Sequence, residues 1–339
     1  MKKKLAAILI PVILIGLIIA VAVTRKAKSE YSDTGVSISD SGFFFDTVIT
    51  ITLYDNSDAP LIEDCFDLCS EYESLLSRTV EGSDVWNINH AGGKPTEVDP
   101  RTAGLIADAL AYSSMTDGRF DISIAAASTL WDFTDHDNDL PDPDSLHEAL
   151  NHIDYKKIQV RGNSIILEDP EMMIDLGGIA KGYIADQLKS YLVSRGVKNA
   201  LINLGGNVLA IGNKPDGSPY LIGIQYPFKE EGDTIAAATL SDSSLVTSGG
   251  YERYIEKDNE IYHHILDPQT GYAVESDIFS VSICCSSSLQ ADALSTCTFL
   301  LGYNEGAKLI ESQKNVSALI ITDDLKMHPI GDFPLKETQ

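Results

Sequence analysis

One segment, residues 173–186, constrains the fold most: a short apolar run meets a pair of glycines and then a pattern of helical period. The run at 174–176 predicts the end of a strand, and the apolar spacing from Ile179 onward predicts a helix. Gly177 and Gly178 permit positive φ or a close approach of the backbone. The amides that open the helix carry a partial positive charge, so this junction suits an anion such as phosphate.

Two charged side chains flank the junction. Lys181 lies one turn inside the predicted helix, from where it can reach back toward a bound anion, and Asp175 supplies a carboxylate at the lip. The segment is not a Walker loop, because the spacing of that motif and its Lys-Ser/Thr pair are absent. Ordinary turn chemistry is the alternative interpretation of a glycine pair after a strand.

The charge of the chain excludes some classes of partner. The 339 residues carry a formal net charge of -25. Residues 1–28 hold six of the 25 basic residues and no acidic one, so the remainder has 19 basic residues against 50 acidic ones. Such a surface repels nucleic acid and anionic lipid, and an anionic ligand needs a metal ion or a few placed cations.

The N-terminal segment predicts a membrane anchor. Three lysines at 2–4 precede an apolar run, residues 5–23, that is long enough to cross a bilayer. Cleavage as a signal peptide is the alternative, because Ala20-Val21-Ala22 offers a small-residue site. We expect an anchor or signal segment at 1–28, a linker at 29–41 and a globular domain at 42–335. An N-terminal anchor before an acidic globular domain places this chain at the cell membrane, with the domain extracytoplasmic.

The five cysteines indicate neither a metal site nor a disulfide framework. They contain no CxxC pair. Cys65 and Cys69 share the apolar face of a predicted helix, so we expect small buried thiols there.

Strand and helix patterns alternate with turn signals through the rest of the chain. Aromatic and β-branched residues at 43–54 predict a strand that starts the fold, and Ser83 is expected to cap a helix. The acidic, proline-containing segment 132–144 is expected to be an inert exposed loop. Helices are expected at 60–77, 102–116 and 291–301, and strands at 158–160, 164–167, 220–225 and on both sides of a glycine pair in 200–212.

Two pairs of residues bear chemistry outside the glycine junction. His263 and His264 point to opposite faces of a predicted strand, so one of them can lie near a site while the other is solvated. Asp292 and Thr296 are four residues apart on one helix face. A carboxylate and a hydroxyl at that spacing can share a hard cation such as Mg²⁺, which accepts oxygen ligands. A helix cap is the alternative role for Asp292.

Taken together, these segments resemble the ApbE family of FAD:protein FMN transferases. The resemblance runs from about Phe45 to Gly302 and rests on five motifs in order, DLGGIAKGYIAD at 175–186, NLGGN at 203–207, TSGGYERY at 247–254, HILDPQTG at 264–271 and ADALST at 291–296. It implies an α+β fold of mixed β-sheets with packed helices and a cleft for FAD. It also implies a Mg²⁺ ion at the pyrophosphate and transfer of FMN to a Thr or Ser hydroxyl of a partner protein, with release of AMP.

The resemblance also assigns residues to roles. It implies metal ligands at Asp292, Ser295, Thr296 and the main-chain carbonyl of Gly178. It implies flavin contacts at Phe45, Thr79, Arg119, Phe120, Asp121, Asp175, Lys181 and Leu266. His264 is a candidate for positioning the acceptor hydroxyl or accepting its proton, with a structural role in its strand as the alternative. Two positions depart from common family choices: Phe45-Asp46-Thr47 stands where many relatives have Met-Gly-Thr, and Thr79 where an aromatic is common.

The expected acceptor is another protein. Family acceptors resemble Asp-x-x-Thr/Ser-Gly-Ala-Thr/Ser, whereas the nearest segment here, 267–273, ends in Ala273, which has no hydroxyl. We therefore expect a membrane or extracytoplasmic redox protein as acceptor. Two other functions compete with transfer: a Mg²⁺-dependent FAD pyrophosphatase that uses water as nucleophile, and a surface flavin-binding protein without catalysis. The Asp292 and Thr296 pair argues against the second, since a carrier needs no metal at the scissile bond.

Overall fold

Residues 37–134, 138–230 and 232–336 are described by the computed structural model of this chain. The expected anchor at 1–28 and most of the expected linker lie outside these ranges. Within these ranges, no helix combines the length and the apolar character that crossing a bilayer requires.

The run at 43–54 folds as a hairpin and not as the single strand expected. β1 (Ile38–Phe44) and β2 (Thr47–Leu53) pair antiparallel. The two residues between them, Phe45 and Asp46, have φ values of 53° and 55°, as a tight two-residue hairpin turn requires. Period-two alternation continued through the turn and concealed it. β1 begins at Ile38, so the last residues of the expected linker belong to the sheet.

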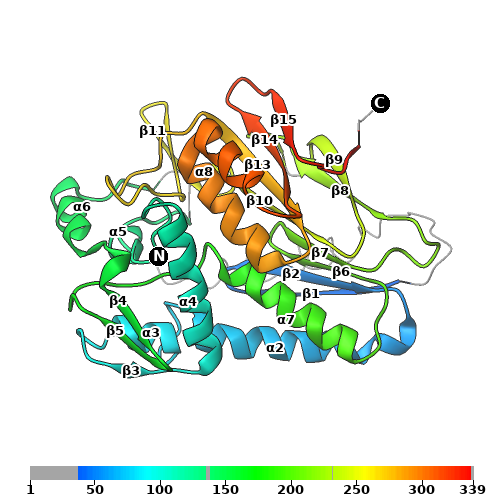
Figure 1. Ribbon diagram of the computed structural model, residues 1–339, viewed down its shortest axis with the longest axis horizontal. Coiled ribbons are helices and arrows are strands. Elements are labelled where there is room, and N and C mark those ends of the chain that lie inside the picture. Colours follow the sequence, from blue (N-terminus) through cyan, green and yellow to red (C-terminus); the bar gives the residue numbers. More distant parts are fainter. Residues whose placement is uncertain (1–36, 135–137, 231, 337–339) are drawn as a thin grey trace, which may run out of the picture. The chain divides into compact units, whose positions relative to one another are not determined.

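The hairpin starts an antiparallel sheet whose strand order is β1-β2-β6-β7-β10-β13-β14-β15 (Figure 1). Its other strands are β6 (Ala200–Leu204), β7 (Asn207–Ile211), β10 (Ser244–Gly249), β13 (Ile278–Cys285), β14 (Ser317–Thr322) and β15 (Met327–Ile330). The strand, glycine pair and strand expected in 200–212 are confirmed as β6 and β7, joined by Gly205 and Gly206, both of positive φ.

Both faces of the central strands are buried. Along β7, Leu209 and Ile211 contribute to the larger core, while Val208 and Ala210 contribute to a second core on the opposite face. Such near-continuous apolar strands are typical of a sheet covered on both sides. A smaller sheet forms the second core with the main sheet. Its strands are β16 (Leu335–Lys336), β9 (Thr234–Leu240) and β8 (Tyr220–Gln225), in that order.

Helices cover the first face. α8 (Ser288–Glu311) packs against β10 and β13, and α7 (Ala180–Ser194) packs between α8 and α2 (Pro60–Leu76) (Figure 1). α8 is broken at Gly302, where φ is 73°. The other helices are α3 (Asp84–Asn89), α4 (Pro100–Met115), α5 (Ala125–Ser128) and α6 (Pro143–Ala149), with short 3-10 turns η1 (Asn56–Asp58), η2 (Leu150–His152) and η3 (Tyr155–Lys157).

The expected helices at 60–77 and 102–116 are confirmed as α2 and α4, and Ser83 caps α3 by accepting the N–H of Trp86. The expected helix at 291–301 is part of the longer α8. Cys65 and Cys69 are both fully buried free thiols on α2.

Two smaller sheets complete the α+β fold. The expected hairpin near 158–167 is confirmed as β4 (Ile158–Arg161) and β5 (Ser164–Leu167), which β3 (Thr96–Glu97) extends. β11 (Tyr254–Lys257) pairs with β12 (Glu260–His263). The acidic loop is attached to this last hairpin, because Asp139 lies 2.9 Å from Lys257 Nζ. Residues 135–137 of the loop lie outside the described ranges.

The segment before α7 is extended, but it is not the strand expected at 174–176. Only Met173 forms a bridge, to Ile124, and the following residues join no sheet. The run is apolar and extended, as a strand is. Its main-chain groups, however, bond to the Asn89 side chain and to the Ile122 carbonyl instead of to a neighbouring strand. The helix expected after the glycines is confirmed, and α7 begins at Ala180.

Candidate active site

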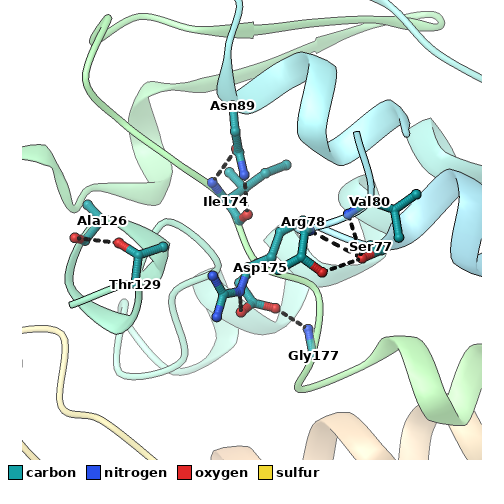
Figure 2. Close-up of polar contacts among 10 residues, drawn as sticks. Ser77, Arg78, Val80, Asn89, Ala126, Thr129, Ile174, Asp175 and Gly177 are labelled. Carbon is teal, nitrogen blue, oxygen red and sulfur yellow. Dashed lines mark hydrogen bonds and ion pairs between the residues drawn. The ribbon is translucent and has the colours of Figure 1, made fainter. Parts of the chain in front are cut away.

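Asp175 is fixed at the centre of the extended segment. The Asn89 side chain forms two hydrogen bonds with the main chain of Ile174, at 2.7 and 2.9 Å. One carboxylate oxygen of Asp175 accepts the Gly177 N–H at 2.7 Å, and the other lies 2.9 Å from Arg78 Nε. Figure 2 shows the Asn89 bonds to Ile174 and, beside them, the contacts of the Asp175 carboxylate with Arg78 and Gly177. The carboxylate thus joins the segment before α7 to the connection that follows α2.

Gly178 provides a close approach between chain segments. A Cβ atom there would lie 3.0 Å from Phe120 Cε2 and 3.6 Å from Thr296 Cγ2. Neither Gly177 nor Gly178 has positive φ. Glycine is therefore required at 178 because the Phe120 ring leaves no room for a side chain. The absence of a side chain lets the main chain before α7 lie beside α8.

α7 and α8 cap each other where they meet. Asp292 of α8 accepts the N–H of Gly182, in the first turn of α7, at 2.7 Å. In return Asp186 of α7 accepts the N–H groups of Ser288 and Leu289, which open α8, at 2.9 and 3.0 Å. Amides at a helix start lack intrahelical partners, and a carboxylate there also suits the helix dipole. Asp292 is therefore a cap, but of the neighbouring helix.

Three hydroxyls lie next to Asp292. Ser295 Oγ and Thr296 Oγ1 donate to the Asp292 carbonyl at 2.9 and 3.3 Å. Ser248, at the end of β10, lies 2.8 Å from Ser295 Oγ and 3.4 Å from Thr296 Oγ1. Ser295 is fully buried and Asp292 is 3% exposed. The end of β10 thus holds in place the two hydroxyls that follow Asp292 on α8.

These oxygen atoms fit a hard divalent cation. Asp292 Oδ2 is taken by the Gly182 amide, while Oδ1 has no hydrogen-bond partner among the described residues. Thr296 follows one helical turn later, and Gly178 approaches it from the other side. In the part of the chain that the structure describes, no three His, Cys, Asp or Glu side chains gather as a metal site. Hydroxyl and carbonyl oxygens must complete such a set, which favours Mg²⁺ over softer metals.

Lys181 brings a positive charge to the glycine pair before α7. Its Nζ donates to Gly177 O at 3.3 Å, so it does reach back over the glycine pair from the first turn of α7. Burial raises the pKa of Asp292, and the Lys181 charge and the Gly182 N–H oppose that rise. An anion bound beside Lys181 and the α7 amides would meet positive potential within an otherwise acidic protein.

His264 is close enough to Lys181 for its titration to respond to the lysine charge. It follows β12, its Nδ1 is 3.2 Å from Arg253 O, and its ring meets Phe133 edge to face with centroids 6.5 Å apart. A bond from Nδ1–H to that carbonyl leaves Nε2 unprotonated and able to accept a proton. Burial, with smaller contributions from the charges of Lys181 and Arg253, lowers the pKa of His264 to about 3. The ring is therefore neutral at pH 7.

Comparison with known proteins identifies the family of this chain. The ApbE family profile matches residues 45–320. The chain belongs to the ApbE family. The FAD:protein FMN transferase of Klebsiella pneumoniae is 36% identical over 287 residues, which cover 84% of this chain and 89% of that protein. The one of Treponema pallidum is 34% identical over 282 residues, 78% of each chain.

Solved ApbE structures share the fold. The crystal structure of the ApbE protein of Thermotoga maritima has a TM-score of 0.79 at 31% identity, and covers 87% of this chain and 97% of its own. The flavin transferase ApbE of Vibrio cholerae has a TM-score of 0.77 at 24% identity over the same shares of the two chains, and its likeness shows the fold alone.

Not every residue expected to contact flavin in this ApbE chain has a free side chain. Asp121 is buried, and its two oxygens accept Ser123 and Tyr155 main-chain N–H groups at 2.8 and 2.9 Å. Burial raises its pKa, against those hydrogen bonds. Arg119 lies 3.4 Å from Asp267 Oδ2. These side chains hold the loop between α4 and α5.

The remaining expected contacts border the same region. Leu266 is buried beside Arg119's partner Asp267. Phe45 donates its N–H to Glu73 at 2.7 Å, and the neighbouring Asp46 carbonyl accepts from Arg253 at 2.8 Å, which connects the β1–β2 turn to the His264 region. Thr79 is exposed next to Arg78.

The structure brings together Gly178, Lys181, Asp292, Ser295 and Thr296 where α7 meets α8. Asp175 and Lys181 both bond to Gly177, and the Lys181 charge acts on His264. No local pattern indicated a role for four residues of this region: Arg78, Gly182, Ser248 and Glu252. The loop 132–144 was expected to be inert, yet Phe133 contacts His264. Ser248 is 47 residues from Ser295, Arg78 is 97 residues from Asp175, and Gly182 is 110 residues from Asp292.

The pKa of Glu252 provides a test of the charges assigned to Lys181 and Asp292. Its side chain is exposed, and loss of part of the water around the carboxyl raises its pKa from 4.5 to about 7, with Asp292 contributing and Lys181 and Arg253 opposing. A raised folded-state pKa contributes stability below about pH 4.5 that is lost as the pH rises through 7. The melting temperature of Glu252→Gln minus that of the natural chain should therefore grow between pH 5 and pH 8. A difference that is constant with pH would contradict this.

Proposed function

We propose that this chain transfers FMN from FAD to a Thr or Ser hydroxyl of a partner protein, in a Mg²⁺-dependent reaction that releases AMP. Relatives at 36% and 34% identity over most of their lengths are FAD:protein FMN transferases. The observation that carries the proposal is Asp292, whose buried carboxylate bonds the first turn of α7 and lies beside Thr296 and the Gly178 main chain.

Asp292, Ser295, Thr296 and the Gly178 carbonyl would hold the Mg²⁺ ion. When bound, it supplies charge neutralisation at the diphosphate. Phosphoryl transfer depends mainly on positioning and on that neutralisation. Asp292 contributes to both, because its Oδ2 bond to Gly182 orients Oδ1 and fixes α8 against α7. Ser248 orients the two hydroxyls.

The start of α7 would bind the diphosphate. The Ala180 and Gly182 N–H groups are bonded to Leu176 O and Asp292, which leaves the Lys181 N–H without a hydrogen-bond partner among the described residues. This N–H and the Lys181 ammonium group beside the glycine pair are available to an anion. A lysine and helix amides recognise phosphate charge without reading the attached group. The remaining specificity for a flavin dinucleotide then depends on contacts on either side of this point.

His264 would take the acceptor proton. The acceptor oxygen bonds to the FMN phosphorus, the bond from that phosphorus to the oxygen of AMP breaks, and the hydroxyl proton passes to His264 Nε2. AMP leaves with the electron pair. Because Nδ1 is held by the Arg253 carbonyl, Nε2 is the nitrogen of this neutral ring that can accept that proton.

Replacing His264 with Gln should lower kcat for transfer at least about 100-fold, as loss of a general base does, and leave FAD affinity within about twofold. In the natural chain, kcat/KM should show no acid limb near pH 6.5 and should stay level to about pH 5, because the pKa of His264 is far below its usual value. His147→Gln, an exposed histidine on α6, is the matched control. An acid limb near 6.5, or near-normal turnover by His264→Gln, would remove His264 from this role.

The acceptor would be a separate protein with a motif of the type Asp-x-x-Thr/Ser-Gly-Ala-Thr/Ser. The similar segment of this chain folds back on itself, with Asp267 N–H bonded to Tyr272 O at 2.8 Å, and its last position is Ala273. We place the chain at the cell membrane through residues 1–28, with the domain extracytoplasmic, and the acceptor among membrane or extracytoplasmic redox proteins.

Incubation with FAD, Mg²⁺ and a protein carrying that motif tests the proposal. Transfer gives AMP and an FMN adduct on the motif's last hydroxyl in equal amounts. Free FMN and AMP without an adduct would favour a pyrophosphatase. Stoichiometric retention of FAD without AMP would favour a flavin-binding protein.

A further inference from the structure

Arg253 ends the connection between β10 and β11, and its side chain anchors that connection. The main chain just before it is held by long hydrogen bonds, because those of the Gly250 and Glu252 N–H groups measure 3.3 and 3.5 Å. The Arg253 side chain, by contrast, donates from Nη2 to the Asp46 carbonyl at 2.8 Å. The shortest of these three bonds is therefore the one made by the arginine side chain.

The Asp46 carbonyl is a fixed point for this side chain. Phe45 and Asp46 form the two-residue turn between β1 and β2, and the two strands pair directly up to it. The Phe45 N–H donates to Glu73 of α2 at 2.7 Å. The turn is thus held by the sheet and by α2, and it offers its carbonyl to a residue 207 positions away in the sequence.

The Arg253 carbonyl binds His264 twice. It accepts the His264 N–H at 3.0 Å and lies 3.2 Å from His264 Nδ1. The first bond continues the β11–β12 ladder by one residue beyond the pair formed by Tyr254 and His263. The second bond needs a proton on Nδ1, since a carbonyl oxygen can only accept. It therefore fixes the orientation of the neutral ring and leaves Nε2 without a proton.

A single residue thus joins the β1–β2 turn to the His264 ring. Because the side chain and the carbonyl belong to the same residue, the bond to Asp46 limits how far the Arg253 carbonyl can move. A small displacement of a reacting group is costly in catalysis. The alternative role for Arg253 is structural only, with the connection attached to the turn and no effect on the ring. The two roles differ in what they predict for the ring nitrogens.

We propose that Arg253 is a positioning residue, which sets the tautomer and the orientation of the His264 ring from the β1–β2 turn. The part of the ring as proton acceptor rests on the proposed function, whereas its tautomer does not. Arg253 acts through His264 and not on the reacting atoms. Its bond to Asp46 uses one N–H and no planar fork, so lysine can replace arginine at this position.

Nitrogen NMR of the full chain with isotope-labelled histidines, at pH 7, tests the proposal. His264→Gln identifies the signals of this ring among those of the seven histidines. In the natural chain they should show a proton on Nδ1 and none on Nε2. Arg253→Met removes the donor and should shift the ring to a mixture of both tautomers. Arg253→Lys should keep the natural tautomer, as should Arg161→Met, which removes an exposed arginine of β4.

The same variants separate positioning from stability in a transfer assay. Arg253→Met should lower kcat at least about tenfold, as misplacement of a reacting group does. The KM for FAD should stay within about twofold, because the Phe45 N–H keeps its bond to Glu73 and only the transition state is affected. Arg253→Lys should restore most of kcat.

A proton on Nε2 instead of Nδ1 in the natural chain would overturn the proposal, as would a natural tautomer or a natural kcat in Arg253→Met, or a lysine variant as impaired as the methionine one. If Arg253→Met does not fold, Arg253→Gln, whose amide ends short of the Asp46 carbonyl, is judged by the same criteria. The NMR measurement needs no acceptor and no turnover. A shifted tautomer in a chain family that modifies no acceptor would sink only the transferase proposal, and a natural tautomer in an active Arg253→Met would sink only this one.

Discussion

Replacing Asp292 with Asn should reduce Mg²⁺-dependent release of AMP from FAD at least about 100-fold, a loss of about 2.7 kcal/mol in transition-state stabilisation. The amide can still accept the Gly182 N–H through its oxygen, so the junction of α7 and α8 should persist. What it loses is the negative charge beside Thr296 and Gly178. The rate is measured as AMP formed at saturating FAD and varied Mg²⁺, with the melting temperature as a check on folding.

Asp186→Asn is the matched control. Asp186 also accepts helix-opening amides, on the other side of the same junction, but it bonds Ser287, Ser288 and Leu289 and none of the hydroxyls beside Asp292. Its substitution should cost stability of the order of a lost cap, about 1 kcal/mol, with little change in the Mg²⁺ dependence. Turnover by Asp292→Asn at the natural rate, or an equal loss of Mg²⁺ dependence in both variants, would rule out Asp292 as a metal ligand.

Replacing Gly182 with Ala should destabilise the protein by at least about 3 kcal/mol, at the upper end of the cost of overpacking. The added Cβ would lie 2.6 Å from Asp292 Cβ and closer still to the Ser288 carbonyl oxygen. Neither is the end of a flexible side chain, so α7 and α8 must separate. The same separation would withdraw Asp292 from the start of α7. Urea unfolding measures the loss.

Gly104→Ala is the contrasting change. Gly104 is inside α4, and a Cβ there would meet nothing within 4 Å. Helix propensity alone should then stabilise the protein by up to about 1 kcal/mol. If Gly182→Ala were as stable as the natural chain, the close crossing of the two helices, and with it the geometry assigned to Asp292, would be wrong.

Local sequence pattern predicted most elements of this fold, since helix periodicity and turn residues are local properties. α2, α4 and the β4–β5 hairpin follow from them. The pattern missed the turn at Phe45 and Asp46, because an aromatic residue seldom opens such a turn, no glycine marks it, and the apolar alternation runs through it. It also predicted a strand at 174–176, where the main chain of Ile174 bonds to the Asn89 side chain and not to a neighbouring strand.

The candidate site was predicted in part. Asp292 and Thr296 share one helix face, so their spacing indicated a common role. Arg78 and Ser248 could not be placed, because their partners lie 97 and 47 residues along the chain, at Asp175 and Ser295. The spacing on α8 also gave no sign that Asp292 would bond the start of α7. Such pairings depend on how α7, α8 and β10 meet, which no local pattern records.

The central claim is tested most directly by mass spectrometry of an acceptor protein with the Asp-x-x-Thr/Ser-Gly-Ala-Thr/Ser motif, after incubation with FAD, Mg²⁺ and this chain. We expect one FMN per acceptor, on the last hydroxyl of the motif, and none with Asp292→Asn or without Mg²⁺. An acceptor that stays unmodified while FMN and AMP accumulate would contradict the account.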